Sequence, residues 1–282
     1  MNLSDITVIE KILSDAGFSF KKSLGQNFLT DPYVCPKMAA ASVDGDTGVI
    51  EIGPGIGVLT KELCKAAKKV VAIELDNRLK PVLKKTLKEY DNVEIIFGDA
   101  MKMDLNALIN EKFTDCGRVS VCANLPYYIT SPIIMGLLQS RLPIDNITVM
   151  VQKEAADRLC AEVGSRQAGA VTVAVNYYAE SEVLFSVGRN SFVPPPKVDS
   201  AVIRLKIREN PPIEIKDEKK FFAFVKACFA QRRKTLCNTV SNTMGIDRGK
   251  LADVLSNLDI NPTVRSEQLS MKQLADISNL LF

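Results

Sequence analysis

Residues that could do chemistry follow four short β-rich runs in the first half of the sequence. Each run is apolar and ends in glycine, an acid or an amide. The strands of an open parallel α/β sheet end at one common edge, where such sheets bind their ligands. We therefore expect the following segments to meet at one site: Glu51-Ile52-Gly53-Pro54-Gly55-Ile56-Gly57, Ile73-Glu74-Leu75-Asp76, Gly98-Asp99-Ala100 and Asn124-Leu125-Pro126-Tyr127.

The glycine segment predicts a tight turn whose backbone a ligand can approach closely. A dinucleotide site prefers the spacing G-x-G-x-x-G, whereas Gly53, Gly55 and Gly57 are spaced G-x-G-x-G. Pro54 also lacks the N–H that a pyrophosphate would use. The segment indicates a nucleoside-type ligand without choosing among several, and a strand–helix turn that binds nothing is the alternative.

Two acids follow the next two runs. Glu74 is placed to accept hydrogen bonds from both hydroxyls of a ribose. Asp99 can accept a hydrogen bond from an adenine amino group, while a neighbouring backbone N–H donates to the ring. A solvated surface acid and an unliganded Gly-Asp turn are the alternatives, but successive strand ends bearing such residues favour a nucleoside site.

The segment from Asn124 to Tyr127 has the residue types that methylation of an adenine amino group requires. That nitrogen is a poor nucleophile because its lone pair is delocalised into the ring. The Asn124 oxygen and a backbone carbonyl can accept its two N–H groups and favour a pyramidal nitrogen. Pro126 stiffens the turn, and Tyr127 can stack on a flipped or single-stranded base. A polar turn with buried aromatics is the alternative interpretation.

Composition limits the chemistry further. The 282 residues include no histidine and no tryptophan, so imidazole catalysis is excluded and base stacking falls to Tyr, Phe or Arg. Seven scattered cysteines without a C-x-x-C pair predict no disulfide framework, no metal site and a cytoplasmic location. No apolar run approaches the roughly 18 residues that a membrane span requires, so we expect no membrane association. The net charge of +3 is too small to identify a nucleic-acid partner.

The pattern from residue 48 to 207 predicts a doubly wound, mostly parallel α/β sheet with one antiparallel edge strand. A helix is predicted before the sheet, with an apolar face formed by Ile6, Ile9, Ile12 and Leu13. Asp31-Pro32 predicts the start of another helix. Strands are predicted at 49–52, 69–74, 93–97, 118–123, 146–151, 182–187 and 198–207. Helices are predicted near 57–67, 76–89, 131–141 and 153–162.

A change in composition near residues 208–218, with two adjacent prolines, predicts a domain boundary. We expect one domain at 1–207 and a small helical domain at 208–282. Residues 206–282 hold 13 Lys or Arg and 9 Asp or Glu residues, a net charge of +4, so the basic excess lies in this part.

Over nearly its whole length the chain resembles the KsgA/RsmA family of ribosomal small-subunit adenine dimethyltransferases. The resemblance lies in residues 22–29, 51–55, 73–76, 98–100, 124–127, 192–200 and 229–234. It implies a Rossmann-like domain that binds S-adenosylmethionine, followed by a helical RNA-binding domain. It also implies dimethylation of two adjacent adenosines near the 3′ end of 16S ribosomal RNA, in the small subunit or its precursor. We expect the chain to act as a monomer.

The resemblance also implies roles for particular residues. Asn27 and Leu29 would contact the cofactor from the N-terminal loop. Gly53 would hold its methionine end, Glu74 its ribose and Asp99 its adenine. The expected cofactor-binding set is Gln26, Asn27, Leu29, Gly53, Gly55, Glu74, Leu75, Asp99, Ala100 and Asn124. The expected catalytic set is Asn124, Leu125, Pro126, Tyr127 and Phe192.

Three further features concern the RNA. Phe192 is expected either to stack on the target base opposite Tyr127 or to anchor a hydrophobic loop. Arg232, Arg233 and Lys234 are interpreted as a phosphate-binding run, with a solvated helix face as the alternative. Ala168 stands where the family commonly has an aromatic residue before a glycine, which puts the substrate contacts of that loop in doubt.

Two other functions remain open at this point. The related enzymes that methylate adenine in large-subunit RNA and confer macrolide resistance would share Asn124 and its neighbours. A non-catalytic nucleic-acid-binding factor of the same fold, as mitochondrial transcription factor B illustrates, is a second alternative. The intact segment from Asn124 to Tyr127 argues against the latter.

Overall fold

The computed structural model describes residues 3, 5–15 and 28–282, which form two compact units. The first unit consists of Met1–Ala156 and Glu182–Ile207, and the second of Asp157–Ser181 and Arg208–Phe282. One border between the units therefore falls at residues 207 and 208. The segment Asp157–Ser181 was expected in the first domain but is grouped with the second unit.

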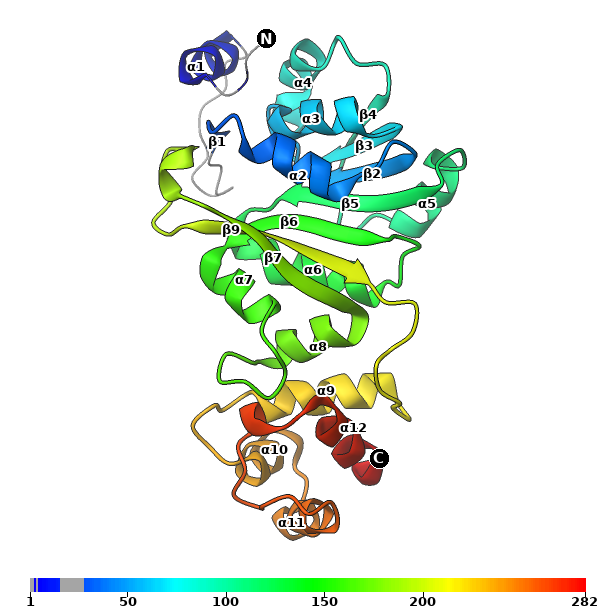
Figure 1. Ribbon diagram of the computed structural model, residues 1–282, viewed down its shortest axis with the longest axis vertical. Coiled ribbons are helices and arrows are strands. Elements are labelled where there is room, and N and C mark those ends of the chain that lie inside the picture. Colours follow the sequence, from blue (N-terminus) through cyan, green and yellow to red (C-terminus); the bar gives the residue numbers. More distant parts are fainter. Residues whose placement is uncertain (1–2, 4, 16–27) are drawn as a thin grey trace. The chain divides into compact units, whose positions relative to one another are not determined.

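A seven-stranded sheet with the order β4-β3-β2-β5-β6-β9-β7 is the centre of the α/β part (Figure 1). Its strands are β2 (Thr47–Ile52), β3 (Lys69–Glu74), β4 (Val93–Phe97), β5 (Arg118–Asn124), β6 (Asn146–Gln152), β7 (Ala179–Val187) and β9 (Ser200–Ile207). The first five pair in parallel, and β9 runs antiparallel to β6. This confirms the predicted Rossmann-like class. One detail differs: the antiparallel strand β9 is second from the edge, because it pairs with both β6 and β7.

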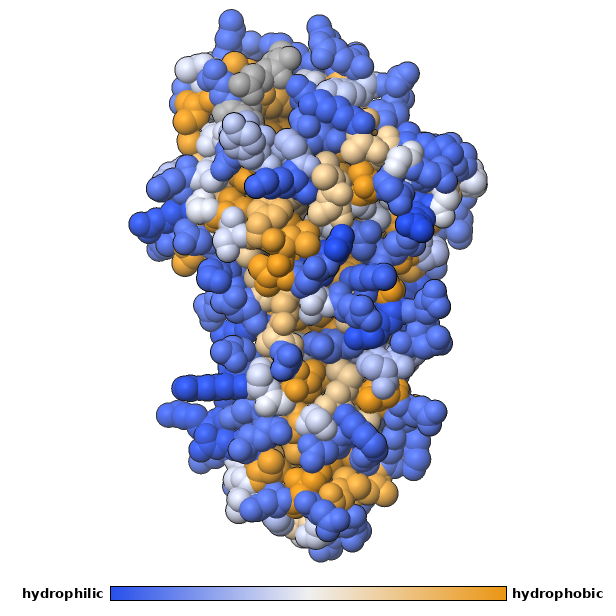
Figure 2. All heavy atoms as spheres, viewed as in Figure 1, coloured by the Kyte–Doolittle hydropathy of each residue, from blue (hydrophilic) through white to orange (hydrophobic). Residues whose placement is uncertain are grey.

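The outermost strand, β7, carries charged side chains as well as apolar ones. Val183 is 45% exposed, and hydrophobic residues gather where β7 crosses the face shown in Figure 2. Glu182 binds Arg204 and Glu180 binds Arg208 through ion pairs of 2.6 and 2.9 Å. Charged groups along an edge strand disfavour pairing with a strand of another chain.

Helices α3 (Val58–Ala66), α4 (Lys80–Thr86), α6 (Thr130–Gln139) and α7 (Lys153–Leu159) connect the strands close to where they were predicted. Helix α5 (Leu105–Lys112) was not predicted. Only Ile109 of α5 is buried, so the helix has no apolar stripe to reveal it. Its one local signal is Asp104, whose carboxylate accepts the N–H of Ala107 and caps the helix.

Two helices precede the first strand of the large sheet. In α1 (Ile6–Asp15) the buried residues are Ile9, Ile12 and Leu13, as predicted, whereas Ile6 is 41% exposed. The start predicted at Asp31 is wrong, because α2 spans Val34–Ser42. The Asp31 carboxylate instead accepts the N–H of Tyr33 in the preceding turn.

The second unit is built from helices around one apolar core. They are α8 (Ala170–Tyr178), α9 (Glu218–Cys228), α10 (Leu236–Met244), α11 (Arg248–Asn257) and α12 (Met271–Leu281). Tyr178 stacks on Phe222 with 5.4 Å between ring centroids, and its hydroxyl donates to Glu218 over 2.6 Å. Val173 belongs to the same core as Phe221. These contacts explain why residues 157–181 group with the C-terminal helices. Among the described residues, no helix has the length and apolar character needed to span a bilayer.

Candidate active site

The register of the sheet brings the predicted segments to one edge. Strands β3 and β5 lie on either side of β2, which is where the direction of winding reverses and where open α/β sheets bind ligands. Glu51 of β2 pairs with Cys122 of β5, so Gly53 and Asn124 follow side by side. The four predicted segments line a single cavity of the first unit. They supply the following lining residues: Gly53, Gly55, Glu74, Leu75, Asp99, Ala100, Asn124, Leu125, Pro126 and Tyr127.

The glycine turn between β2 and α3 presents bare backbone to this cavity. Gly53 and Gly55 have φ angles of +72° and +58°, a left-handed conformation that favours glycine. A Cβ at either position would have no protein atom within 4 Å. Gly57, with φ +91°, differs because a Cβ there would lie 3.2 Å from Leu87. The first two glycines therefore leave room for a ligand, whereas Gly57 allows close packing.

Glu74 ties the end of β3 to the glycine turn. Its Oε2 accepts the N–H of Gly55 over 3.1 Å, and its Oε1 accepts the N–H of Asp76 over 2.8 Å. The side chain is buried, with 6% relative exposure. Burial raises its pKa, and the two backbone N–H groups oppose that rise. Each carboxylate oxygen retains a lone pair that could accept a further hydrogen bond, and the ribose-binding role expected of Glu74 stays a prediction.

Asp99 and the residues after it form the next part of the wall. Oδ1 of Asp99 accepts the N–H of Met101 over 3.0 Å, and the Lys102 ammonium lies 3.7 Å from Oδ2. The side chain remains 35% exposed, so its carboxylate is accessible to a further hydrogen-bond donor. Leu75 and Met101 line the same cavity and are 57% and 50% exposed. Such apolar side chains at the rim suit the faces of a nucleobase.

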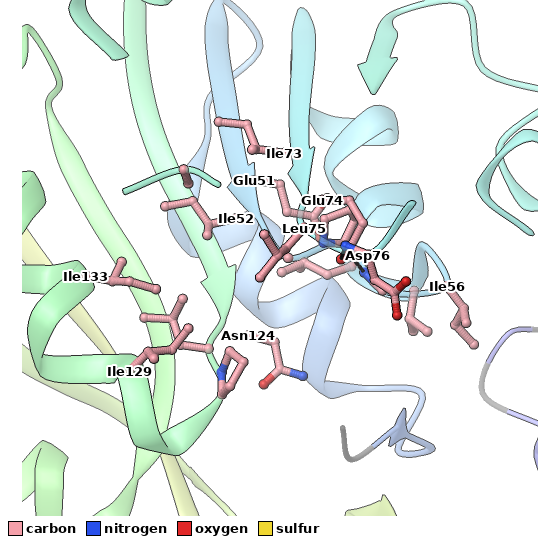
Figure 3. A pocket seen from close by; sticks show the side chains of 18 of the residues that line it. Glu51, Ile52, Ile56, Ile73, Glu74, Leu75, Asp76, Asn124, Ile129 and Ile133 are labelled. Atoms are coloured by element: carbon pink, nitrogen blue, oxygen red, sulfur yellow. Dashed lines mark hydrogen bonds between the residues drawn. The ribbon is translucent and has the colours of Figure 1, made fainter. Parts of the chain in front are cut away.

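Asn124 lies across the cavity from Glu74 and Asp76, and Ile129 and Ile133 lie on its own side (Figure 3). It is the last residue of β5, and the chain then turns through Pro126 into the 3₁₀ helix η3 (Tyr127–Ile129). The Tyr127 hydroxyl is 2.7 Å from that of Ser200 on β9. Burial raises the pKa of Tyr127, and the hydrogen bond with Ser200 opposes the rise.

Two short strands close another part of the cavity. Strand β1 (Phe28–Leu29) pairs antiparallel with β8 (Phe192–Val193). Leu29 and Phe192 both line the cavity, yet each is only 3% exposed and packs in the apolar core beside α2. This burial favours the loop-anchor interpretation of Phe192. The predicted cofactor residues Gln26 and Asn27 lie outside the described residues.

Glu51 belongs to the predicted glycine segment, but the sequence assigned it no role of its own. It lines the cavity but is 1% exposed, and its Oε2 has no hydrogen-bond partner within the described ranges. Burial raises its pKa to about 8, and the charge of Glu74 adds to this rise. Its position two residues before Gly53, on a strand ending at the site, was the available signal.

The raised pKa of Glu51 predicts a pH-dependent stability. The folded state keeps the proton up to about pH 8, whereas the unfolded chain releases it above about 4.5. The free energy of unfolding of the ligand-free protein should therefore fall between pH 5 and 8, by an amount on the order of 4 kcal/mol. We expect Glu51→Gln to remove the contribution of Glu51 and leave a smaller fall, to which the raised pKa of Glu74 contributes, in denaturant titrations. Glu89→Gln, at an exposed carboxylate, should leave the full fall unchanged, and an equal slope in all three proteins would contradict the assignment.

The predicted RNA-binding residues lie in the second unit. Arg232, Arg233 and Lys234 are all exposed, and they occupy the turn between α9 and α10. The alternative interpretation placed these residues on a solvated helix face. It was wrong about the secondary structure, because they lie in a turn. Arg232 donates to the backbone carbonyl of Arg166 over 2.6 Å, which ties the basic turn to the loop that contains Arg166. Ala168, in the same loop as Arg166, has no exposed surface and its side chain faces the protein interior.

Comparisons with known proteins show the family to which the chain belongs. The family model for ribosomal RNA adenine dimethylase matches residues 17–282. A ribosomal RNA small subunit methyltransferase A of Geobacillus thermodenitrificans is 52% identical over 96% of this chain and 94% of its own length. A protein of the same name from Bacillus pumilus is 48% identical over the same shares.

Two solved structures are similar over most of the chain. A dimethyladenosine transferase from Plasmodium falciparum has a TM-score of 0.72 and 29% identity, covering 88% of this chain and 95% of that one. The 23S rRNA methyltransferase ErmE has a TM-score of 0.66 and 25% identity, covering 90% and 99%.

A cavity at the switch point of a Rossmann-like sheet, lined by a glycine turn, a buried carboxylate and an amide at successive strand ends, is typical of an S-adenosylmethionine-dependent methyltransferase. With a match that extends from residue 17 to the last residue, the chain belongs to the ribosomal RNA adenine dimethylase family. The cavity fits the cofactor: two glycines leave open space, and the buried carboxylate of Glu74 faces it.

Proposed function

We propose that the chain dimethylates the N6 atoms of two adjacent adenosines near the 3′ end of 16S ribosomal RNA, in the small subunit or its precursor. The observation that carries this proposal is the position of Asn124 beside Gly53 in one cavity. The names of the relatives at 52% and 48% identity support the small subunit as the source of the RNA. The seven free cysteines suit a reducing cytoplasm, where one copy of the chain would act on each particle.

The cofactor supplies an electrophilic methyl group on its sulfonium sulfur. The chain positions the nucleophile: Oδ1 of Asn124 accepts one N–H of the target amino group, and a backbone carbonyl accepts the other. The Pro126 carbonyl already accepts the Ile129 N–H and the Thr130 hydroxyl, so we assign the second acceptor to Leu125. Two acceptors held in this way favour a pyramidal nitrogen with its lone pair toward the methyl group. The dimethylated product releases its protons to solvent, which suits a site without histidine.

Gly53 and Gly55 would leave space for the methionine end of the cofactor, and Glu74 would accept hydrogen bonds from its ribose. Asp99, Ala100 and Leu75 would surround its adenine. Tyr127, whose hydroxyl is held by Ser200, would then stack on the target base. A ring fixed at its hydroxyl loses little conformational freedom when a base stacks on it.

The exposed basic turn of the second unit would bind RNA phosphates. We expect the triple substitution of Arg232, Arg233 and Lys234 by Gln to weaken binding of the RNA. The slope of log K against log salt should become shallower by about two, because each phosphate contact contributes about 0.7 on single-stranded nucleic acid.

The matched control neutralises three exposed lysines scattered over the same unit, Lys219, Lys250 and Lys272. It makes the same change in net charge. Filter-binding titrations at several salt concentrations would separate the two variants. If the two variants had equal slopes, the basic turn would be an ordinary solvated surface without a specific role in RNA binding.

The decisive test incubates the protein with labelled cofactor and immature small subunits and maps the modified bases. Two adjacent N6-dimethyladenosines near the 3′ end of the RNA are expected. Label in large-subunit RNA, with macrolide resistance in cells that express the chain, would favour the rival function. Binding of the particle without label transfer would favour a non-catalytic factor.

A further inference from the structure

Tyr128 is an aromatic residue at the cavity whose exposure the proposed chemistry leaves unexplained. Its side chain is 59% exposed although it lines the same cavity as Asn124 and Glu74. Leu75 and Met101, the other large exposed apolar side chains of that lining, are explained by a cofactor adenine. An exposed aromatic ring at the rim of a binding site is a common feature of sites that a ligand covers.

The backbone directs the side chains of Tyr127 and Tyr128 to different sides of one short helix. Both belong to the 3₁₀ helix η3, which has three residues per turn, so their side chains leave the axis about 120° apart. Tyr127 is half-buried, and its hydroxyl is held by Ser200. The two rings therefore cannot lie on the same face of one base. Tyr127 is directed toward the protein, where Ser200 holds it, and Tyr128 is directed toward solvent at the rim of the cavity.

We propose that the Tyr128 ring is the platform on which the nucleobase adjacent to the target adenosine stacks. The inference rests on the proposed function, in which RNA is the substrate. A target base that enters the cavity leaves its neighbour without a stacking partner, and an exposed aromatic ring at the rim replaces that partner. When the neighbour is also adenine, its large purine face matches the ring. Tyr128 thus acts as a positioning residue for the RNA and touches no reacting atom.

Kinetics with the full chain provide the first test. Because one base–aromatic contact contributes about tenfold to a hundredfold in affinity, we expect Tyr128→Ala to raise the KM for RNA by that factor. The KM for the cofactor should stay unchanged. Tyr128→Phe keeps the ring and should restore the RNA KM. Loss of function in both variants would assign the effect to the hydroxyl and overturn the proposal, as would an unchanged KM in Tyr128→Ala.

Fluorescence gives a second test that does not depend on turnover. The chain contains no tryptophan, so Tyr128→Trp introduces a single indole whose emission a stacked base quenches. The RNA is a hairpin with two adjacent adenosines, bound with S-adenosylhomocysteine in place of the methyl donor. We expect quenching with this RNA and its loss at saturation when the neighbour of the target is replaced by an abasic nucleotide.

The matched control is Tyr33→Trp, at a residue that is 73% exposed and absent from the cavity lining. Its emission should not respond to the abasic replacement. Quenching of Tyr128→Trp that persists with the abasic RNA would overturn the proposal. If the unmodified protein methylates no RNA, the proposed function itself fails, whereas normal methylation by Tyr128→Ala contradicts the stacking proposal alone.

Discussion

Asn124→Ala is expected to lower the rate of methyl transfer by about a thousandfold while the affinity for S-adenosylmethionine changes by no more than a few-fold. The loss follows from removal of a preorganised acceptor that acts only on the reacting nitrogen. Cofactor affinity is retained because the glycine turn follows β2 and Glu74 ends β3, and the substitution leaves the backbone of both strands in place. Single-turnover assays with labelled cofactor measure the rate, and calorimetry measures the affinity.

Two results would contradict this assignment of Asn124. Turnover close to that of the unmodified protein would show that the Asn124 amide takes no part in methyl transfer. A large loss of cofactor affinity at unchanged rate would make Asn124 a cofactor ligand instead. Asn146→Ala is a useful comparison, because Asn146 lies at the opposite end of the neighbouring strand β6 and donates to Ser120 within the protein. It should alter stability without a selective effect on the rate.

The sheet was predictable because its strands are short apolar runs with turn signals between them. Strands β3 and β4 have the predicted bounds, since both are runs rich in β-branched and aromatic residues; β3 is buried from Val70 onward, and β4 is half-buried throughout. Helix α5 was missed because it buries only Ile109. The start of α2 was misplaced because Asp31 has two possible roles, as a helix cap or as the acceptor in a turn, and the sequence does not distinguish them.

The sequence predicted which residues meet at the site where these residues directly follow strands of the parallel sheet. Side chains that follow consecutive parallel strands must meet at one edge, so Gly53, Glu74, Asp99 and Asn124 could be placed together from spacing alone. Roles that depend on burial could not be placed in this way. Phe192 is a core residue that touches the cavity, and nothing in its local sequence reveals the apolar core beside α2.

Glu51 and Tyr128 also show that burial could not be predicted from the sequence. Glu51 is a charged residue type that the fold buries, and Tyr128 is an aromatic type that the fold exposes. Each departs from what its residue type predicts, and only tertiary structure reveals such departures. Ala168 is a related case: its importance was inferred from a missing aromatic, whereas its burial shows that the position faces the protein and not the solvent.

Glu74→Gln is expected to raise the dissociation constant for S-adenosylmethionine about a hundredfold, while the rate at saturating cofactor stays within a few-fold. The carboxylate accepts N–H groups with both oxygens, from Gly55 and from Asp76. A glutamine has one oxygen, so its NH₂ group would face one of those donors, and the glycine turn would lose an anchor. The control is Glu94→Gln, at an exposed carboxylate that binds Lys112 and lines no part of the cavity.

The two substitutions together separate binding from chemistry. Asn124→Ala should change the rate and spare the affinity, and Glu74→Gln should do the reverse. The pH dependence adds an independent check, because burial raises the pKa of Glu74. Protonation removes the charge that accepts the ribose hydroxyls, so cofactor affinity should begin to fall at a higher pH than an ordinary glutamate would allow. In Glu74→Gln the fall of cofactor affinity at low pH should vanish, while the affinity stays low at every pH. A fall that persists unchanged would assign this pH dependence to another carboxylate of the cavity.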